Sequence, residues 1–166
     1  MARRTRITEE IRQTRPFPTR GQEALVALLR TSDRVRRYLD TVVQREGLTA
    51  QQYNVLRILR GAGPGGLPTL EIAERMIERT PGVTRLVDRL VDEGYVRRER
   101  CERDRRIVYC AITPEGLAVL ERLDGPVDAA DRLVMRDLDD EAIACLIDAL
   151  DAMRASLAAG EIDDGA

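Results

Sequence analysis

Residues 83–116, VTRLVDRLVDEGYVRRERCERDRRIVYCAITPEG, change from helical to strand periodicity about a third of the way along. Apolar residues in the first part follow the i, i+3, i+4, i+7 spacing of one buried helix face, at Val83, Leu86, Val87 and Leu90. Thr80 followed by Pro81 has the chemistry of an N-cap and a first helical residue. Gly94 is placed to end the helix. The sequence therefore predicts a helix between Thr80 and Gly94.

A β-hairpin is expected next, from strands at residues 95–100 and 106–113 that flank the hydrophilic tip 101–105. The second strand alternates two sets of residues: Val108, Cys110 and Ile112 against Ile107, Tyr109 and Ala111. Alternation with period two lets one face be buried, so we expect Cys110 to be a small core residue. Thr113 and Pro114 repeat the N-cap and proline signal and predict a further helix.

Upstream of residue 80, two shorter helices are expected. Thr49 and Gln52 have capping-box spacing before a helix that ends ahead of the glycine-rich loop 61–66. A two-turn helix follows at 69–76. The order helix, tight turn, helix predicts a helix-turn-helix, and the hairpin after it predicts a winged helix. The fold class expected is mainly α with a small β-hairpin wing.

Longer helical patterns flank this module, at residues 21–46 and 114–158. The first stripe is Leu25, Leu28, Leu29, Ser32, Val35, Leu39 and Val43, and the last, in a helix at 139–158, is Ile143, Leu146, Leu150, Met153 and Leu157. Gly125 and Pro126 should kink or break the helix that begins at Pro114. Because such stripes are long for a small monomer, we expect a helical dimerisation region and a homodimer.

The domain organisation follows from these elements. Residues 1–20 are expected to be a flexible basic N-terminal arm, and residues 159–166 an acidic tail. The dimerisation region is expected at 21–46 with 114–158, and a winged helix-turn-helix, a motif that in many proteins binds DNA, is expected at 47–113.

Composition excludes several kinds of chemistry. All 27 basic residues are arginine and there is no histidine, which excludes a histidine base, histidine metal ligands and lysine chemistry. The three cysteines fit neither a disulfide framework nor a CxxC metal site, so no metal, no cofactor and no enzymatic activity is expected. There is no signal-peptide pattern and no apolar run long enough to span a membrane, which indicates a cytoplasmic protein without a membrane partner.

Charge is distributed unevenly along the chain. The net charge is +4 over residues 1–20, +1 over 21–52 and +3 over 53–113, but −10 over 114–166. A basic front beside an acidic end is expected if one face meets a polyanion. Simple solubility of the acidic helices explains the same numbers equally well.

The outer face of the helix before Gly94 carries the candidate DNA-binding residues Thr84, Arg85, Asp88 and Arg89. Arg85 and Arg89 are like charges one turn apart, which are unfavourable unless acids or an external anion lie near. In a major groove each guanidinium could bind guanine O6 and N7. The alternative is a solvated face on which Asp88 and Asp92 compensate the arginines.

The hairpin tip carries a second candidate set, Arg103, Asp104, Arg105 and Arg106. Three arginines are too crowded to be neutralised by Asp104 alone, which could instead fix the tip by hydrogen bonds. An arginine here could enter a narrow minor groove. A charged turn that is only solvated is the alternative.

Three motifs mark the hairpin: Gly94-Tyr95-Val96-Arg97-Arg98 at its start, Asp104-Arg105-Arg106 at its tip and Ile112-Thr113-Pro114-Glu115-Gly116 at its exit. At this spacing they resemble the wing of the MarR family of bacterial transcriptional regulators, and residues 83–90 resemble the family's recognition helix. The likeness extends over about residues 21–158. It implies a homodimeric repressor that binds a palindromic operator in double-stranded DNA, with Arg106 as the minor-groove arginine. It also implies release of DNA when a small aromatic or phenolic effector binds between the lobes.

Several assignments stay open at this point. Tyr38 and Tyr53 could line an effector cleft or be partly buried packing residues. Cys101 lies beside Arg100, a setting that favours thiolate, but redox sensing is the lesser expectation. Cys145 is expected to pack beside the last apolar stripe. A winged helix can also be a protein-interaction module without sequence-specific DNA binding, and that is the alternative function.

Overall fold

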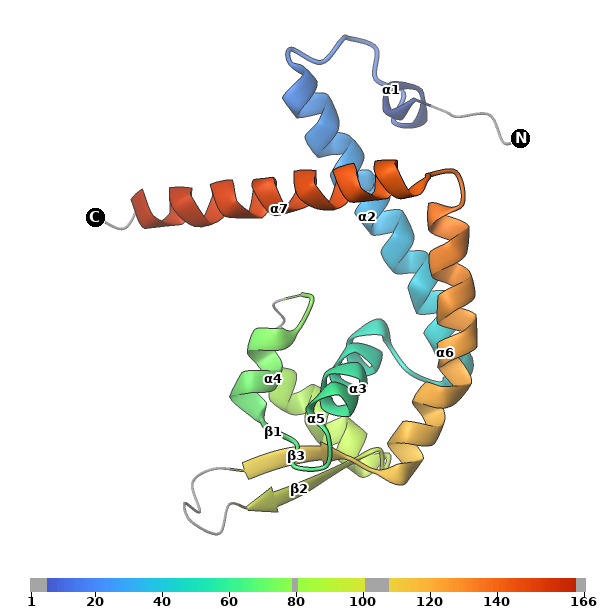
Figure 1. Ribbon diagram of the computed structural model, residues 1–166, viewed down its shortest axis with the longest axis vertical. Coiled ribbons are helices and arrows are strands. Elements are labelled where there is room, and N and C mark those ends of the chain that lie inside the picture. Colours follow the sequence, from blue (N-terminus) through green and yellow to red (C-terminus); the bar gives the residue numbers. More distant parts are fainter. Residues whose placement is uncertain (1–5, 79–80, 101–107, 164–166) are drawn as a thin grey trace. The chain divides into compact units, whose positions relative to one another are not determined.

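The computed structural model describes residues 6–78, 81–100 and 108–163. The chain forms two compact units, Met1–Val127 and Asp128–Ala166. It is mainly helical with one three-stranded antiparallel sheet, which confirms the expected fold class (Figure 1). In the described part of the chain, no helix is long and apolar enough to cross a membrane.

The first unit begins with a long helix, α2 (Arg20–Val43), which Thr19 caps by accepting a hydrogen bond from the Gln22 amide at 3.2 Å. A 3-10 turn, η1 (Gln44–Glu46), ends at Gly47 in a left-handed conformation. Only the last turn of α2 is fully buried, whereas Leu25 and Leu29 are 49% and 62% exposed. Most of the apolar stripe predicted on this helix is therefore exposed or only partly buried within one chain.

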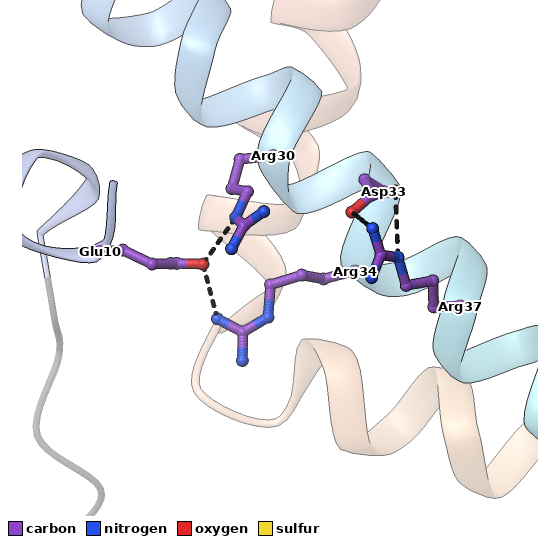
Figure 2. Close-up of polar contacts among 5 residues, drawn as sticks. All are labelled: Glu10, Arg30, Asp33, Arg34 and Arg37. Carbon is purple, nitrogen blue, oxygen red and sulfur yellow. Dashed lines mark hydrogen bonds and ion pairs between the residues drawn. The ribbon is translucent and has the colours of Figure 1, made fainter. Parts of the chain in front are cut away.

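A short helix, α1 (Ile7–Glu10), forms inside the segment expected as a flexible arm. Its Glu10 carboxylate accepts a hydrogen bond from Arg30 Nε at 2.9 Å and pairs with Arg34 at 3.2 Å, while Asp33 pairs with Arg37 (Figure 2). The hydrogen bond from Arg30 is the main cause that lowers the pKa of Glu10. Part of the arm is thus held on α2 by charge pairing.

Three helices and the sheet enclose the core of the first unit. Helix α3 (Ala50–Ala62) begins with the predicted capping box, in which Thr49 and Gln52 each bond the other's backbone amide. It packs against α4 (Thr69–Arg75) and α5 (Val83–Asp92). The core side chains of these helices are fully buried: Val55, Leu56, Leu59, Ile72, Val87 and Leu90.

The sheet has the order β1-β3-β2, with β1 (Leu67–Pro68), β2 (Val96–Arg100) and β3 (Val108–Ile112). The hairpin β2–β3 was predicted; β1 was not. Cys110 is buried as expected, and Ala111 is buried too, so both faces of the central strand β3 are covered at this point. Gly66 precedes β1 with a φ of +66°, and a Cβ there would lie 2.2 Å from the Cys110 carbonyl oxygen. The close approach of β1 to β3 therefore needs glycine.

Helix α6 (Pro114–Met135) begins at the predicted cap, where the Thr113 hydroxyl accepts a hydrogen bond from the Gly116 amide at 3.1 Å. A kink or a break was expected at Gly125-Pro126, and the break is wrong, since one helix runs through Pro126. A proline removes a single helical hydrogen bond, and Leu123 and Val127 are buried on either side of it. Packing of the two flanking turns offsets the lost bond.

Helix α7 (Asp140–Asp163) makes up most of the second unit and is longer than predicted. It takes in residues 159–163, which were expected as part of an acidic tail. Cys145 is exposed, so the prediction that it packs is wrong within one chain. Exposed apolar side chains follow the helix, at Leu146, Ile147, Met153 and Leu157.

Candidate nucleic-acid interface

A helix-turn-helix is formed by α4 and α5, as predicted. The turn is held to α3 because the Asn54 side-chain oxygen accepts a hydrogen bond from the Ile77 amide at 3.0 Å. Helix α5 begins later than predicted, at Val83, with Gly82 as its N-cap at a φ of +102°. Pro81 belongs to the turn, and Thr80, the predicted cap, lies outside the described residues. A left-handed Gly82 stops the helix from extending back to Pro81.

The two faces of α5 differ as the periodicity predicted. Val83, Val87 and Leu90 are buried against the core. Thr84, Arg85 and Arg89 are exposed on the other side, with Asp88 half-buried beside them. Within the described part of the chain, neither the Arg85 nor the Arg89 guanidinium forms an ion pair. Both are therefore available to an external anion.

Asp88 differs from its neighbours because it already has a partner. Its Oδ1 lies 2.6 Å from Arg98 Nη1 on β2, so the pair joins the second helix of the helix-turn-helix to the first strand of the hairpin. Burial lowers the pKa of Arg98, but hydrogen bonds to Asp88 and Cys110 outweigh that effect and raise it. The pair was not predicted from the sequence, because no helix or strand spacing relates positions 88 and 98.

The hairpin base is described, but its tip is not. Arg103, Asp104, Arg105, Arg106 and Cys101 all lie outside the described residues. At the base, Arg97 donates to the Pro64 carbonyl at 3.2 Å and pairs with Glu99. The candidate residues of α5 and the start of the hairpin are thus brought together in one unit.

Polar contacts fix α5 and α6 to α3. The Gln52 amide, 4% exposed, donates to both carboxylate oxygens of Glu93 at the end of α5, at 3.3 and 3.4 Å. Arg60 on α3 binds Asp124 on α6 through two hydrogen bonds of 2.8 and 3.0 Å. The hydrogen bonds from Arg60 lower the pKa of Asp124. None of these pairs was predicted from the sequence.

The two tyrosines suggested for an effector site lie on different helices. Tyr38 on α2 is 39% exposed. Tyr53 on α3 is half-buried, its hydroxyl accepts a hydrogen bond from Arg57 Nη1 at 2.9 Å, and the guanidinium lies 5.7 Å from its ring centroid. Among the residues that the structure describes, no polar contact joins the two tyrosines.

Known proteins match both the sequence and this arrangement. The MarR family model matches residues 48–108. The HTH-type transcriptional regulator PecS of Dickeya dadantii is 30% identical over 119 residues, which cover 70% of this chain and 72% of PecS. The chain belongs to the MarR family. The homoprotocatechuate degradative operon repressor of Escherichia coli is 29% identical over 109 residues, covering 66% of this chain and 72% of the repressor.

Solved MarR-family structures match over most of the chain. A MarR transcription factor from Planctomyces limnophilus is 38% identical, with a TM-score of 0.63, and the match covers 82% of this chain and 99% of that one. MepR in the MepR–DNA complex of Staphylococcus aureus is 23% identical, with a TM-score of 0.71. That match covers 78% of this chain and 96% of MepR, and it shows a shared fold. MarR-family proteins are DNA-binding transcriptional regulators rather than enzymes.

Proposed function

We propose that this MarR-family chain is a sequence-specific repressor that binds a palindromic operator as a homodimer. The observation that carries the proposal is the outer face of α5, where Arg85 and Arg89 are exposed beside the wing while Val87 is buried beneath them. A helix of this kind enters the major groove, where guanidinium groups bind guanine bidentately.

The interface is divided between helix and wing. Thr84, Arg85 and Arg89 contact bases and nearby phosphates, and Asp88 lies on the same surface. The wing arginines Arg103, Arg105 and Arg106, with Asp104 fixing the tip, contact the backbone and the minor groove. Because the minor-groove code is degenerate, this part supplies affinity more than base specificity.

Dimerisation through residues 21–46 and 114–158 is supported by apolar side chains that one chain leaves exposed. Leu29 on α2 is 62% exposed, and Ile147 and Leu157 on α7 are 53% and 68% exposed. A second copy would cover such surfaces and set two recognition helices about 34–36 Å apart, one turn of DNA, or a multiple of it. Light scattering should then report twice 18.7 kDa, and a monomer at micromolar concentration would contradict this.

The regulatory part of the proposal is repression relieved by a small aromatic or phenolic effector, in the cytoplasm where the operator lies. Its support is the resemblance to a family that includes the E. coli repressor of a homoprotocatechuate degradative operon. Tyr38 and Tyr53 remain the proposed effector contacts.

Binding of operator and scrambled duplexes over a range of salt concentrations tests the assignment of α5. Arg85→Ala should cost about 1–3 kcal/mol on the operator and little on scrambled DNA. Arg106→Ala should weaken both and lower the salt slope by about one. Arg37→Ala, on the surface of α2, is the matched control and should change neither. Equal weakening of both duplexes by Arg85→Ala would make that arginine a phosphate contact only. Binding of an acidic protein without any DNA preference would favour an interaction module.

A further inference from the structure

The pair between Asp88 and Arg98 lies where the recognition helix meets the wing. Asp88 is on the outer face of α5, and Arg98 is on β2, opposite Cys110 of β3 in the strand register. Cys110 is fully buried, and its Sγ lies 3.6 Å from the Thr69 hydroxyl at the start of α4. Helix α5 and both strands of the wing therefore meet at the Arg98 side chain, and Cys110 in turn contacts the start of α4.

A carboxylate on a DNA-binding face repels phosphate, so it lowers affinity unless it has another role in binding. One such role would be base reading, since an aspartate can accept a hydrogen bond from cytosine N4. In this chain the Asp88 carboxylate is already engaged by a guanidinium at 2.6 Å, the short distance of a charge-assisted hydrogen bond. Turning toward a base would break that bond and leave Arg98, itself only 33% exposed, without its counter-charge.

The pair also decides which arginines stay available to DNA. Asp88 lies three residues after Arg85 and directly before Arg89 on the same helix. Residues three apart on a helix are neighbours, so an Asp88 without Arg98 would pair with Arg85. Arg98 binds the carboxylate from the strand side and leaves Arg85 without an intramolecular partner among the described residues.

We infer that Asp88 and Arg98 are positioning residues that form a brace between α5 and β2. The brace holds the wing at a fixed angle to the recognition helix and keeps Arg85 available for DNA. Asp88 is then not a base-reading residue. This inference rests on the proposed function and refines the role of one residue of that interface.

The effect on DNA binding should exceed the effect on folding. Asp88 and Arg98 are 47% and 33% exposed, and exposed pairs of this kind contribute little to the stability of a fold. Wing and helix must contact DNA at the same time, so a change in the angle between them weakens both sets of contacts.

The test measures operator affinity for wild type, Asp88→Asn, Arg98→Gln and the double variant. Each single change should lower affinity about tenfold, and the double variant should lose no more than either, as expected for two residues that act as one pair. Selection from random duplexes should return the wild-type consensus for Asp88→Asn. Arg98→Lys keeps the charge and should restore part of the affinity.

Asp92→Asn is the matched control, because Asp92 is an acid one turn later on α5. Removal of the negative charge of Asp92 near DNA should leave operator affinity unchanged or raise it. Asp88→Asn, in contrast, should lower operator affinity. Three results would overturn the inference: losses that multiply in the double variant, a base preference that changes only in Asp88→Asn, or a lower salt slope in Arg98→Gln.

Amide hydrogen exchange of the two wing strands gives a readout without DNA. Asp88→Asn and Arg98→Gln should accelerate exchange at the same amides of β2 and β3, and Asp92→Asn should not. If the wild type proves to have no DNA preference, the proposed function fails while this measurement still tests the brace. Unchanged exchange in both variants would refute the brace even if the operator is found.

Discussion

Replacement of Asp124 by asparagine tests the joint between α3 of the proposed DNA-binding domain and α6, which belongs to the proposed dimerisation region. Two hydrogen bonds of 2.8 and 3.0 Å join Asp124 to Arg60, and the side chains are 43% and 31% exposed. Exposed ion pairs contribute about 0.2–1 kcal/mol, and a bidentate pair lies at the upper end of that range. We therefore expect Asp124→Asn to cost about 1 kcal/mol, or about 2–4 °C in Tm for a chain of this size.

The stabilisation by the Asp124–Arg60 pair should depend on pH. Arg60 lowers the pKa of Asp124 below its ordinary value of 3.8, so the folded state binds its proton less readily than the unfolded state. The stabilisation is then fully present above the unfolded pKa and is lost as pH falls through the folded pKa.

Thermal unfolding of wild type and Asp124→Asn at equal protein concentration should show a gap at pH 7 that closes in acid. Asp128→Asn, on the same helix one turn later and exposed, is the control and should leave Tm nearly unchanged at neutral pH. Arg60→Gln and the double variant should lose no more than Asp124→Asn alone. A gap that stays constant down to a pH below the folded pKa would refute the argument that charge pairing is its source.

Two further predictions concern the arm and the sheet. Glu10→Gln should release α1 from α2, and in the wild type the same release should occur as pH falls through the lowered pKa of Glu10. The NMR signal of the Arg30 Nε–H, which donates to Glu10, reports both changes. A signal that responds neither to the substitution nor to acid would contradict the docking of α1 on α2. Gly66→Ala should cost at least about 1–2 kcal/mol from its left-handed backbone, and more from the clash with the Cys110 carbonyl. Urea unfolding measures this cost, and equal stability of Gly66→Ala and the control Gly65→Ala would contradict it.

Elements with strong local chemistry were predicted well from the sequence. The capping box at Thr49, the N-cap at Thr113 and the buried face of α5 each depend on residues within one or two turns. Hydrophobic spacing and capping act at that range, so the sequence alone carries the information.

Features that depend on contacts between distant segments were missed or misplaced. Strand β1 has two residues and exists only because it pairs with β3, more than 40 residues later. The start of α5 depends on the left-handed Gly82, and the continuity of α6 depends on burial around Pro126. Pattern reasoning also placed Asp88 among the DNA contacts without finding Arg98, whose approach is set by the fold of the wing.

Selection of bound sequences from random duplexes tests the central claim most directly, because it measures function, symmetry and half-site spacing together. We expect enrichment of a palindrome with half-sites about one turn, roughly 10–10.5 base pairs, apart or a multiple of it. We also expect loss of that enrichment in Arg85→Ala. No enrichment with the wild-type protein, or enrichment of a single half-site without symmetry, would contradict sequence-specific binding as a homodimer.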